Sequence, residues 1–130
     1  MSYSKTKLPN VTLRIGADWV ETAETDTIRL PYDGTSVATA ARGTLELLGR
    51  AVASARQAAP VMAALANYER AELLERIGAL VRRDAAEFAE LISQETGRPI
   101  QEARGEVERG LSTIAASAAA ARDLHGEVVQ

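Results

Sequence analysis

A glycine-proline link between two long amphipathic segments is the feature that most constrains this chain. The link runs from Glu95 to Pro99, and apolar residues recur at helical spacing on both sides of it. Gly97 can adopt the left-handed conformation that closes a helix, and Pro99 suits the first turn of the next helix, where its missing N–H is not needed. The pattern predicts two long helices joined by a tight corner. Because neither helix could bury its apolar stripe alone, we expect them to pack on each other or on a larger body.

Both apolar stripes consist mainly of aliphatic side chains and alanine. Only 4% of the residues are aromatic, so leucine, valine, isoleucine and above all alanine must fill any core. Alanine lets helices pack closely but supplies few buried methylene groups, each of which contributes about 0.8 kcal/mol. The upstream stripe is Leu74, Ile77, Val81, Phe88, Leu91 and Ile92. The downstream stripe is Ile100, Ala103, Val107, Leu111, Ile114, Ala118, Ala121 and Leu124.

A third amphipathic segment precedes these two. Its apolar residues, beginning with Leu45, fall on one helical face, and Thr44 is placed to cap its first turn. We expect Asn67 to cap the next helix, and Asp84 to bend or divide it. The predicted helices cover about residues 44–64, 67–96 and 99–125, the last of them ending at His125-Gly126.

The first forty residues lack helical periodicity and predict short strands. Residues 1–12 are expected to form a flexible lead-in. Two apolar pairs around Gly16 predict a hairpin, and two further strands are expected on either side of the turn at residues 31–34, so that the strands cover residues 13–41. The fold class is therefore mainly α with a short N-terminal β-hairpin region. An extended segment is expected to start at Val128 and Val129.

Composition and charge exclude several classes of function. The chain has 130 residues, which fits one domain, and a formal net charge of -3 with arginine and glutamate interspersed, so we expect no nucleic-acid partner. Cysteine is absent, which is compatible with a reducing compartment. The longest apolar stretch, around residues 114–121, is far shorter than the roughly 20 residues that a bilayer requires. We therefore expect a soluble, cytoplasmic protein without a membrane partner.

No motif in the sequence completes a catalytic, cofactor or metal site. The glycines nowhere fit a dinucleotide fingerprint, and in the phosphate-loop-like stretch 105–110 the required lysine is replaced by Leu111, inside a predicted helix. Ser117, Asp123 and His125 are too close along one helix to act as nucleophile, orienting group and base. One histidine and no cysteine make a zinc site improbable. Glu102 and Glu106 lie one helical turn apart. The arginines near enough to form ordinary surface pairs with them are Arg98, Arg104 and Arg109.

The order of short motifs nevertheless resembles the amino-terminal region of the aldehyde dehydrogenase superfamily. The resemblance runs from about Leu13 to the end of the chain, so that residues 13–130 are expected to form a partial piece of the α/β fold of that family. The motifs that carry it are Arg14–Val20, Pro31–Ala38, Tyr68–Leu74, Glu95–Ile100, Glu102–Val107 and Leu124–Glu127.

The resemblance implies a parent enzyme that oxidises an aldehyde to an acid, or in some members to a thioester, with NAD or NADP as hydride acceptor. In the family a cysteine thiolate adds to the carbonyl group and a glutamate activates the water that releases the acid. No position of this chain matches those residues or the cofactor-binding core. We therefore expect the chain to be a front portion of such an enzyme, inactive and without a cofactor on its own, whose partner is the missing C-terminal part.

Arg109 is the one site residue that the resemblance implies. It falls near the mouth of the substrate tunnel in the family, where an arginine contacts the anion of phosphonate, phosphate or carboxylate aldehydes. The turn Pro31–Gly34 is also similar to that of phosphonoacetaldehyde, lactaldehyde and glyceraldehyde-3-phosphate dehydrogenases. The guanidinium group suits the task because its planar fork can bond two oxygens of an oxyanion. The alternative is a surface arginine paired with Glu106 or Glu108.

A second function remains open beside the enzyme. Apolar faces that the rest of an enzyme does not cover would favour association, so the chain could be a self-standing helical interaction or oligomerisation module without enzymatic activity. On either interpretation we expect a homo-oligomer or an assembly formed by domain exchange.

Overall fold

The computed structural model describes residues 9–126, which fall into two compact units. The strand unit comprises residues 9–62 and 94–97, and the helix unit comprises residues 63–93 and 98–126. Residues 1–8 of the expected lead-in, and the extended segment expected at Val128 and Val129, lie outside the described residues.

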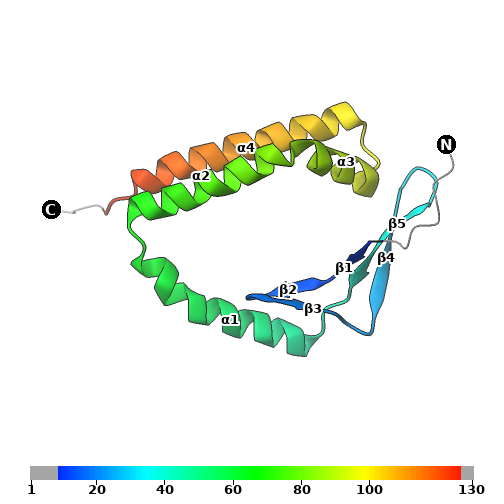
Figure 1. Ribbon diagram of the computed structural model, residues 1–130, viewed down its shortest axis with the longest axis horizontal. Helices are drawn as coiled ribbons and strands as arrows, with labels where there is room; N and C mark the ends of the chain where they lie inside the picture. Colours follow the sequence, from blue (N-terminus) through cyan, green and yellow to red (C-terminus); the bar gives the residue numbers. More distant parts are fainter. Residues whose placement is uncertain (1–8, 127–130) are drawn as a thin grey trace. The chain divides into compact units, whose positions relative to one another are not determined.

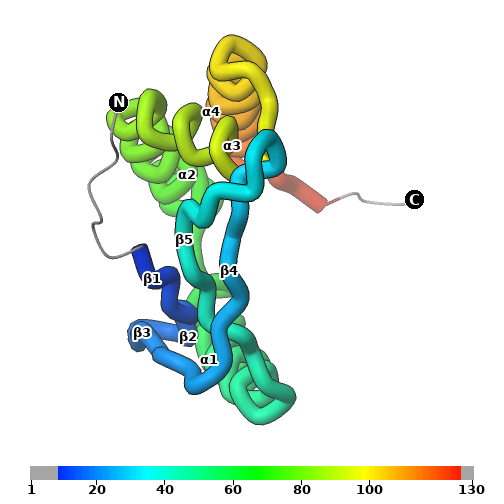
Figure 2. The backbone as a smooth tube through the Cα atoms, turned by 90° about the vertical axis from the view of Figure 1, so that its right-hand side faces the viewer, coloured from blue at the N-terminus to red at the C-terminus, as the bar shows by residue number. Residues whose placement is uncertain are grey.

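The strand unit contains two small sheets and the first helix. The strands are β1 (Asn10–Val11), β2 (Leu13–Ile15), β3 (Asp18–Val20), β4 (Thr25–Arg29) and β5 (Ser36–Ala41). β2 and β3 form the predicted antiparallel hairpin, and Gly16 in its turn has a φ of 60°. β5 lies between β4, which is antiparallel to it, and β1, which is parallel to it, as Figure 2 shows. The predicted turn at residues 31–34 is confirmed by a hydrogen bond from the Gly34 N–H to the Leu30 carbonyl at 2.9 Å.

β1 corrects the prediction for the start of the chain. Residues 10 and 11, assigned to the flexible lead-in, pair with Thr39 and Ala40 of β5. The Thr39 N–H donates to the Pro9 carbonyl at 3.0 Å, and the Thr39 hydroxyl donates to Asn10 Oδ1 at 3.2 Å. A two-residue strand shows no alternation of apolar and polar residues, and its partner lies about thirty residues away. Local sequence patterns therefore could not reveal it.

The first helix, α1 (Leu45–Ala64), begins where the sequence predicts. The Leu47 N–H donates to Thr44 Oγ1 at 3.2 Å, which confirms Thr44 as the capping residue. No residue of α1 is buried, and its apolar face remains open: Leu45 is 87% exposed, and Leu48 and Val52 are also exposed.

The helix unit is built on a pair of antiparallel helices. Its elements are α2 (Asn67–Arg83), most of α3 (Ala85–Thr96) and α4 (Ile100–Arg122), and α2 lies alongside α4 (Figure 1). The start of α2 meets the end of α4, because Asn67 Nδ2 donates to the Leu124 carbonyl at 2.6 Å and Arg122 pairs with Glu75 at 2.7 Å. Gly78 marks a close approach of the two helices, since a Cβ atom there would lie 3.3 Å from Ile114 Cγ2.

The core of the helix unit is made from the small side chains that the sequence offers. Four positions of α4 are buried at helical spacing and confirm the central part of the downstream stripe: Ala103, Val107, Leu111 and Ala118. Its last predicted member, Leu124, lies beyond α4 and is 59% exposed. Ala71 of α2 and Ala89 of α3 are buried as well. The upstream stripe is only partly covered, because Ile77, Phe88 and Leu91 are each more than 40% exposed.

The predicted division of the helix at Asp84 is confirmed: α2 ends at Arg83, α3 begins at Ala85, and the φ of -103° at Asp84 departs from helical geometry. The cap of α2 and the end of α4 differ from the sequence predictions. Asn67 lies inside the first turn of α2 and is not its cap; the Glu69 carboxylate accepts a hydrogen bond from the Ala66 N–H at 2.7 Å instead. The last helix ends at Arg122, three residues before His125, where the Leu124 carbonyl is engaged by Asn67.

The corner at Gly97 is confirmed. Gly97 has a φ of 72°, and α4 starts after Pro99, whose carbonyl accepts hydrogen bonds from the Glu102 and Ala103 N–H groups. None of the helices within residues 9–126 is long and apolar enough to cross a membrane.

Candidate functional site

Arg109, the predicted site residue, lies in the first half of α4 in a cluster of three charged side chains. It forms an ion pair with Glu106, one turn earlier on the same helix. The same carboxylate oxygen, Oε1, also accepts from Arg98 Nη1 at 2.7 Å. We call Arg98, Glu106 and Arg109 the charged cluster.

Helix geometry explains how these residues meet. Positions three apart lie on one helix face, so Glu106 and Arg109 are neighbours. Arg98 lies in the link just before α4, and its backbone carbonyl accepts a hydrogen bond from the Ser93 hydroxyl at 2.7 Å. The link at Gly97 thereby brings a second guanidinium group to the carboxylate of Glu106.

The charged cluster contains more positive than negative charge. The hydrogen bond from Arg109 lowers the pKa of the Glu106 carboxyl below its usual value; desolvation opposes this shift, and the charges of Arg109 and Arg98 add to it. The hydrogen bond to Glu106 likewise raises the pKa of Arg109 above its ordinary value. Glu106 is therefore ionised at neutral pH, and two positive charges face one negative charge.

Arg109 is accessible although it is paired. Its side chain is 71% exposed, whereas that of Glu106 is 34% exposed. The pairing with Glu106 is the surface contact that was expected as the alternative to an anion site. It occupies one edge of a guanidinium group that carries five N–H donors, so it leaves donors for a second oxyanion.

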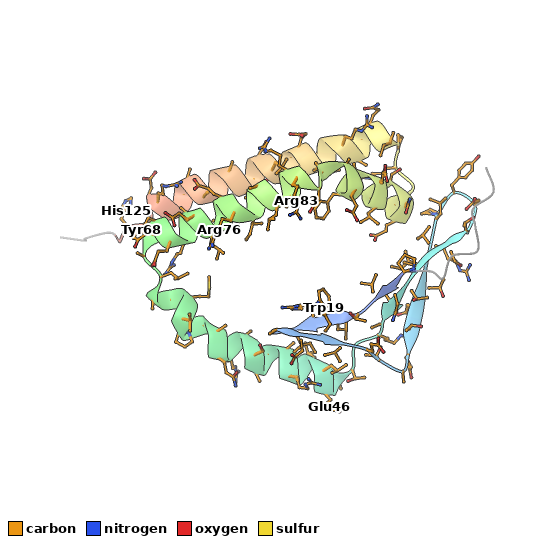
Figure 3. All side chains as sticks on the ribbon, viewed as in Figure 1. Trp19, Glu46, Tyr68, Arg76, Arg83 and His125 are labelled. Carbon is orange, nitrogen blue, oxygen red and sulfur yellow. The ribbon has the colours of Figure 1, made fainter. Side chains whose placement is uncertain are left out.

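The other sequence candidates form no site. Residues 105–110, which resemble a phosphate loop, lie inside α4, as predicted. Ser117 is on α4, and His125 Nδ1 contacts the backbone carbonyl of Asp123, so the Asp123 carboxylate does not orient the ring. Figure 3 shows His125 beyond the end of α4. Within residues 9–126, no three histidine or acidic side chains are grouped to hold a metal ion.

An open pocket of 450 Å³ in the strand unit does not fit a nicotinamide dinucleotide. Among the described residues that line it, the polar side chains are those of Arg14 and Thr44, and the Thr44 hydroxyl already caps α1. Arg14 donates to the Gly16 carbonyl and lies 5.0 Å from the ring of Trp19, which is labelled in Figure 3. None of the described residues that line this pocket has an acidic side chain that could bind ribose hydroxyls. The lining is Leu13, Arg14, Ile15, Gly43, Thr44, Leu45, Leu47, Leu48 and Ala51.

Residues 19–130 match the aldehyde dehydrogenase family. The chain is 35% identical over 126 residues to 3-sulfolactaldehyde dehydrogenase of Priestia aryabhattai, a match that covers 97% of this chain and 26% of that protein. It is 30% identical over 129 residues to malonate-semialdehyde dehydrogenase 1 of Geobacillus kaustophilus, covering 98% and 26%. The crystal structure of PnpE in complex with nicotinamide adenine dinucleotide aligns with a TM-score of 0.87 at 28% identity, covering 92% of this chain and 25% of that chain.

The chain therefore belongs to the aldehyde dehydrogenase family, and the resemblance inferred from its motifs is confirmed. The predicted fold class is confirmed as well, as a mainly helical part of the family's fold with short strands at its start. The chain spans about a quarter of the length of the relatives that it matches.

Proposed function

We propose that this chain is part of an enzyme that oxidises an aldehyde carrying a second, negatively charged group, and that Arg109 contacts that group. The observation that carries the proposal is the exposed Arg109 side chain in a cluster with an excess of positive charge. The names of the two relatives support it, because sulfolactaldehyde and malonate semialdehyde each bear an anionic group beside the aldehyde. A guanidinium group can bind either a sulfonate or a carboxylate through paired hydrogen bonds.

The proposal includes NAD or NADP as the hydride acceptor of the complete enzyme. The nicotinamide adenine dinucleotide bound to PnpE supports this choice of cofactor class. The proposal places the cofactor on residues outside this chain, since no position here matches the cofactor-binding core that the resemblance implies. The cysteine-free sequence is compatible with a reducing compartment, so the same proposal includes a cytoplasmic location.

Replacement of Arg109 by methionine in the full-length gene product tests the anion contact. We expect Arg109→Met to lower kcat/KM for malonate semialdehyde about tenfold relative to propanal, because a charge-assisted hydrogen bond is lost only for the anionic substrate. The two aldehydes have the same number of carbon atoms, so propanal serves as the neutral control. Equal losses on both aldehydes would contradict the contact.

Self-association is the second candidate function, and it can accompany the first. The open apolar face of α1, with Leu45, Leu48 and Val52 exposed, favours it. We propose that this face is covered in a homo-oligomer or in an assembly formed by domain exchange. Sedimentation of the chain at high concentration should show species larger than a monomer, and a compact monomer throughout would contradict this proposal.

A further inference from the structure

The charged cluster contains a carboxylate that the proposed function does not use. Glu106 Oε1 accepts from Arg98 at 2.7 Å and is also paired with Arg109. An oxygen that holds two guanidinium groups restricts both of them. An exposed arginine without such a partner would have to give up its side-chain freedom on binding an anion, which weakens binding.

The three residues of the charged cluster differ in their surroundings and in their exposure. Arg98 follows Gly97 in the corner before α4, and its carbonyl is bonded to Ser93. Glu106 lies next to the buried Val107 and is itself only partly exposed. The outermost member is Arg109, with 71% of its side chain exposed. Glu106 is therefore the least exposed of the three side chains, at 34%, whereas Arg98 is 52% exposed and Arg109 is the most exposed.

The charge of Arg98 explains why the Glu106 carboxylate can lie beside a site that binds an anion. Alone, Glu106 would repel an approaching carboxylate or sulfonate group. Arg98 compensates that charge, because two guanidinium groups share one carboxylate. The positive charge of Arg109 is therefore left for the substrate.

We propose that Glu106 is a positioning residue that orients the Arg109 guanidinium group, and that Arg98 compensates the charge of Glu106, so that the three residues together select an aldehyde bearing an anionic group. This inference rests on the proposed function, because the proposed function gives Arg109 a substrate to contact. It assigns the selectivity to a unit of three side chains and not to Arg109 alone.

A double-mutant cycle on the full-length gene product tests the positioning role. The variants are Glu106→Gln, Arg109→Met and the double variant, and the measured quantity is the ratio of kcat/KM for malonate semialdehyde to that for propanal. Glu106→Gln should lower this ratio about fivefold, mainly through a higher KM for malonate semialdehyde, and should change it less than about twofold when Arg109 is already methionine. Glu75→Gln is the matched control, because it removes the carboxylate of the Glu75–Arg122 pair in the same helix unit and should leave the ratio unchanged.

The outcomes separate the two proposals. If Arg109→Met leaves the ratio unchanged, the proposed function fails. If Arg109→Met lowers the ratio but Glu106→Gln leaves it unchanged, raises it, or lowers it equally in both backgrounds, the positioning role is overturned while the proposed function stands. A rise in the ratio is the result that simple removal of a repelling charge would give.

Arg98→Met supplies a second test that keeps Glu106 in place. With its compensating charge removed, Glu106 should repel the anionic aldehyde and lower the ratio about threefold at low ionic strength, and added salt should reduce this loss because the cluster is open to solvent. An unchanged ratio in Arg98→Met would overturn the compensating role of Arg98.

Discussion

Leu111→Ala is expected to lower the free energy of unfolding of the chain by about 3 kcal/mol. Leu111 is 4% exposed and belongs to the core cluster with Ala89, Ala103 and Val107. Two of these three neighbours are alanines, whose side chains cannot move to fill the space left by the removed carbons. The cavity should therefore persist, and its cost adds to the lost transfer free energy. Urea denaturation followed by circular dichroism measures the change.

Leu80→Ala is the matched control for this substitution. Leu80 lies on α2 in the same unit but is 52% exposed, so the same change should cost less than about 1 kcal/mol. Similar losses at the two positions would show that the packing of α4 is not as described here.

Gly97→Val should destabilise the chain by about 2 kcal/mol, because a β-branched residue is strongly disfavoured in the left-handed region. Gly97 has a φ of 72°, and its missing Cβ would lie 3.3 Å from Pro31 Cβ, a contact within the strand unit. The substitution therefore meets both backbone strain and a close neighbour. Thermal denaturation of the unchanged chain and of Gly97→Val, at the same protein concentration, measures this difference in stability.

Gly105→Ala has the opposite expected sign and serves as the control for Gly97→Val. Gly105 lies inside α4 with nothing near the position of an added Cβ, so alanine should stabilise the helix by up to about 1 kcal/mol. A neutral result for Gly97→Val would contradict the left-handed corner between α3 and α4.

The helical part of the fold could be predicted from the sequence because its signals are local. The spacing of Val107, Leu111 and Ala118 marks one face of a helix, and glycine followed by proline marks the corner. The cap of α2 and the end of α4 were less predictable, since they depend on contacts between residues far apart in the sequence. Asn67, expected to cap α2, instead binds the Leu124 carbonyl on the segment that follows α4.

The short strand β1 could not be predicted, because its pairing with β5 joins residues far apart in the sequence. The exposure of the upstream stripe was not predicted either. Amphipathic spacing shows that Ile77 and Phe88 share an apolar character with Val81, but only the packed structure shows which of them α4 covers. The proposed association rests on other apolar residues, the exposed Leu45, Leu48 and Val52 of α1.

The part of the charged cluster that lies on a single helix could be predicted from the spacing of its residues. The pairing of Glu106 with Arg109 follows from their separation of three residues. The convergence of Arg98 on the same oxygen depends on the geometry of the corner as well, and the sequence suggested only that it was near enough to pair. The cysteine nucleophile that the resemblance implies has no counterpart in this chain, which contains no cysteine.

The central claim is that these helices support a reactive centre whose nucleophile, base and cofactor site lie outside this chain. The most direct test is aldehyde-dependent reduction of NAD or NADP, measured by the absorbance of the reduced nicotinamide, for residues 1–130 and for the full-length gene product under the same conditions. We expect no turnover from residues 1–130 and ready turnover from the full-length protein. Aldehyde oxidation by the 130-residue chain alone would contradict the claim.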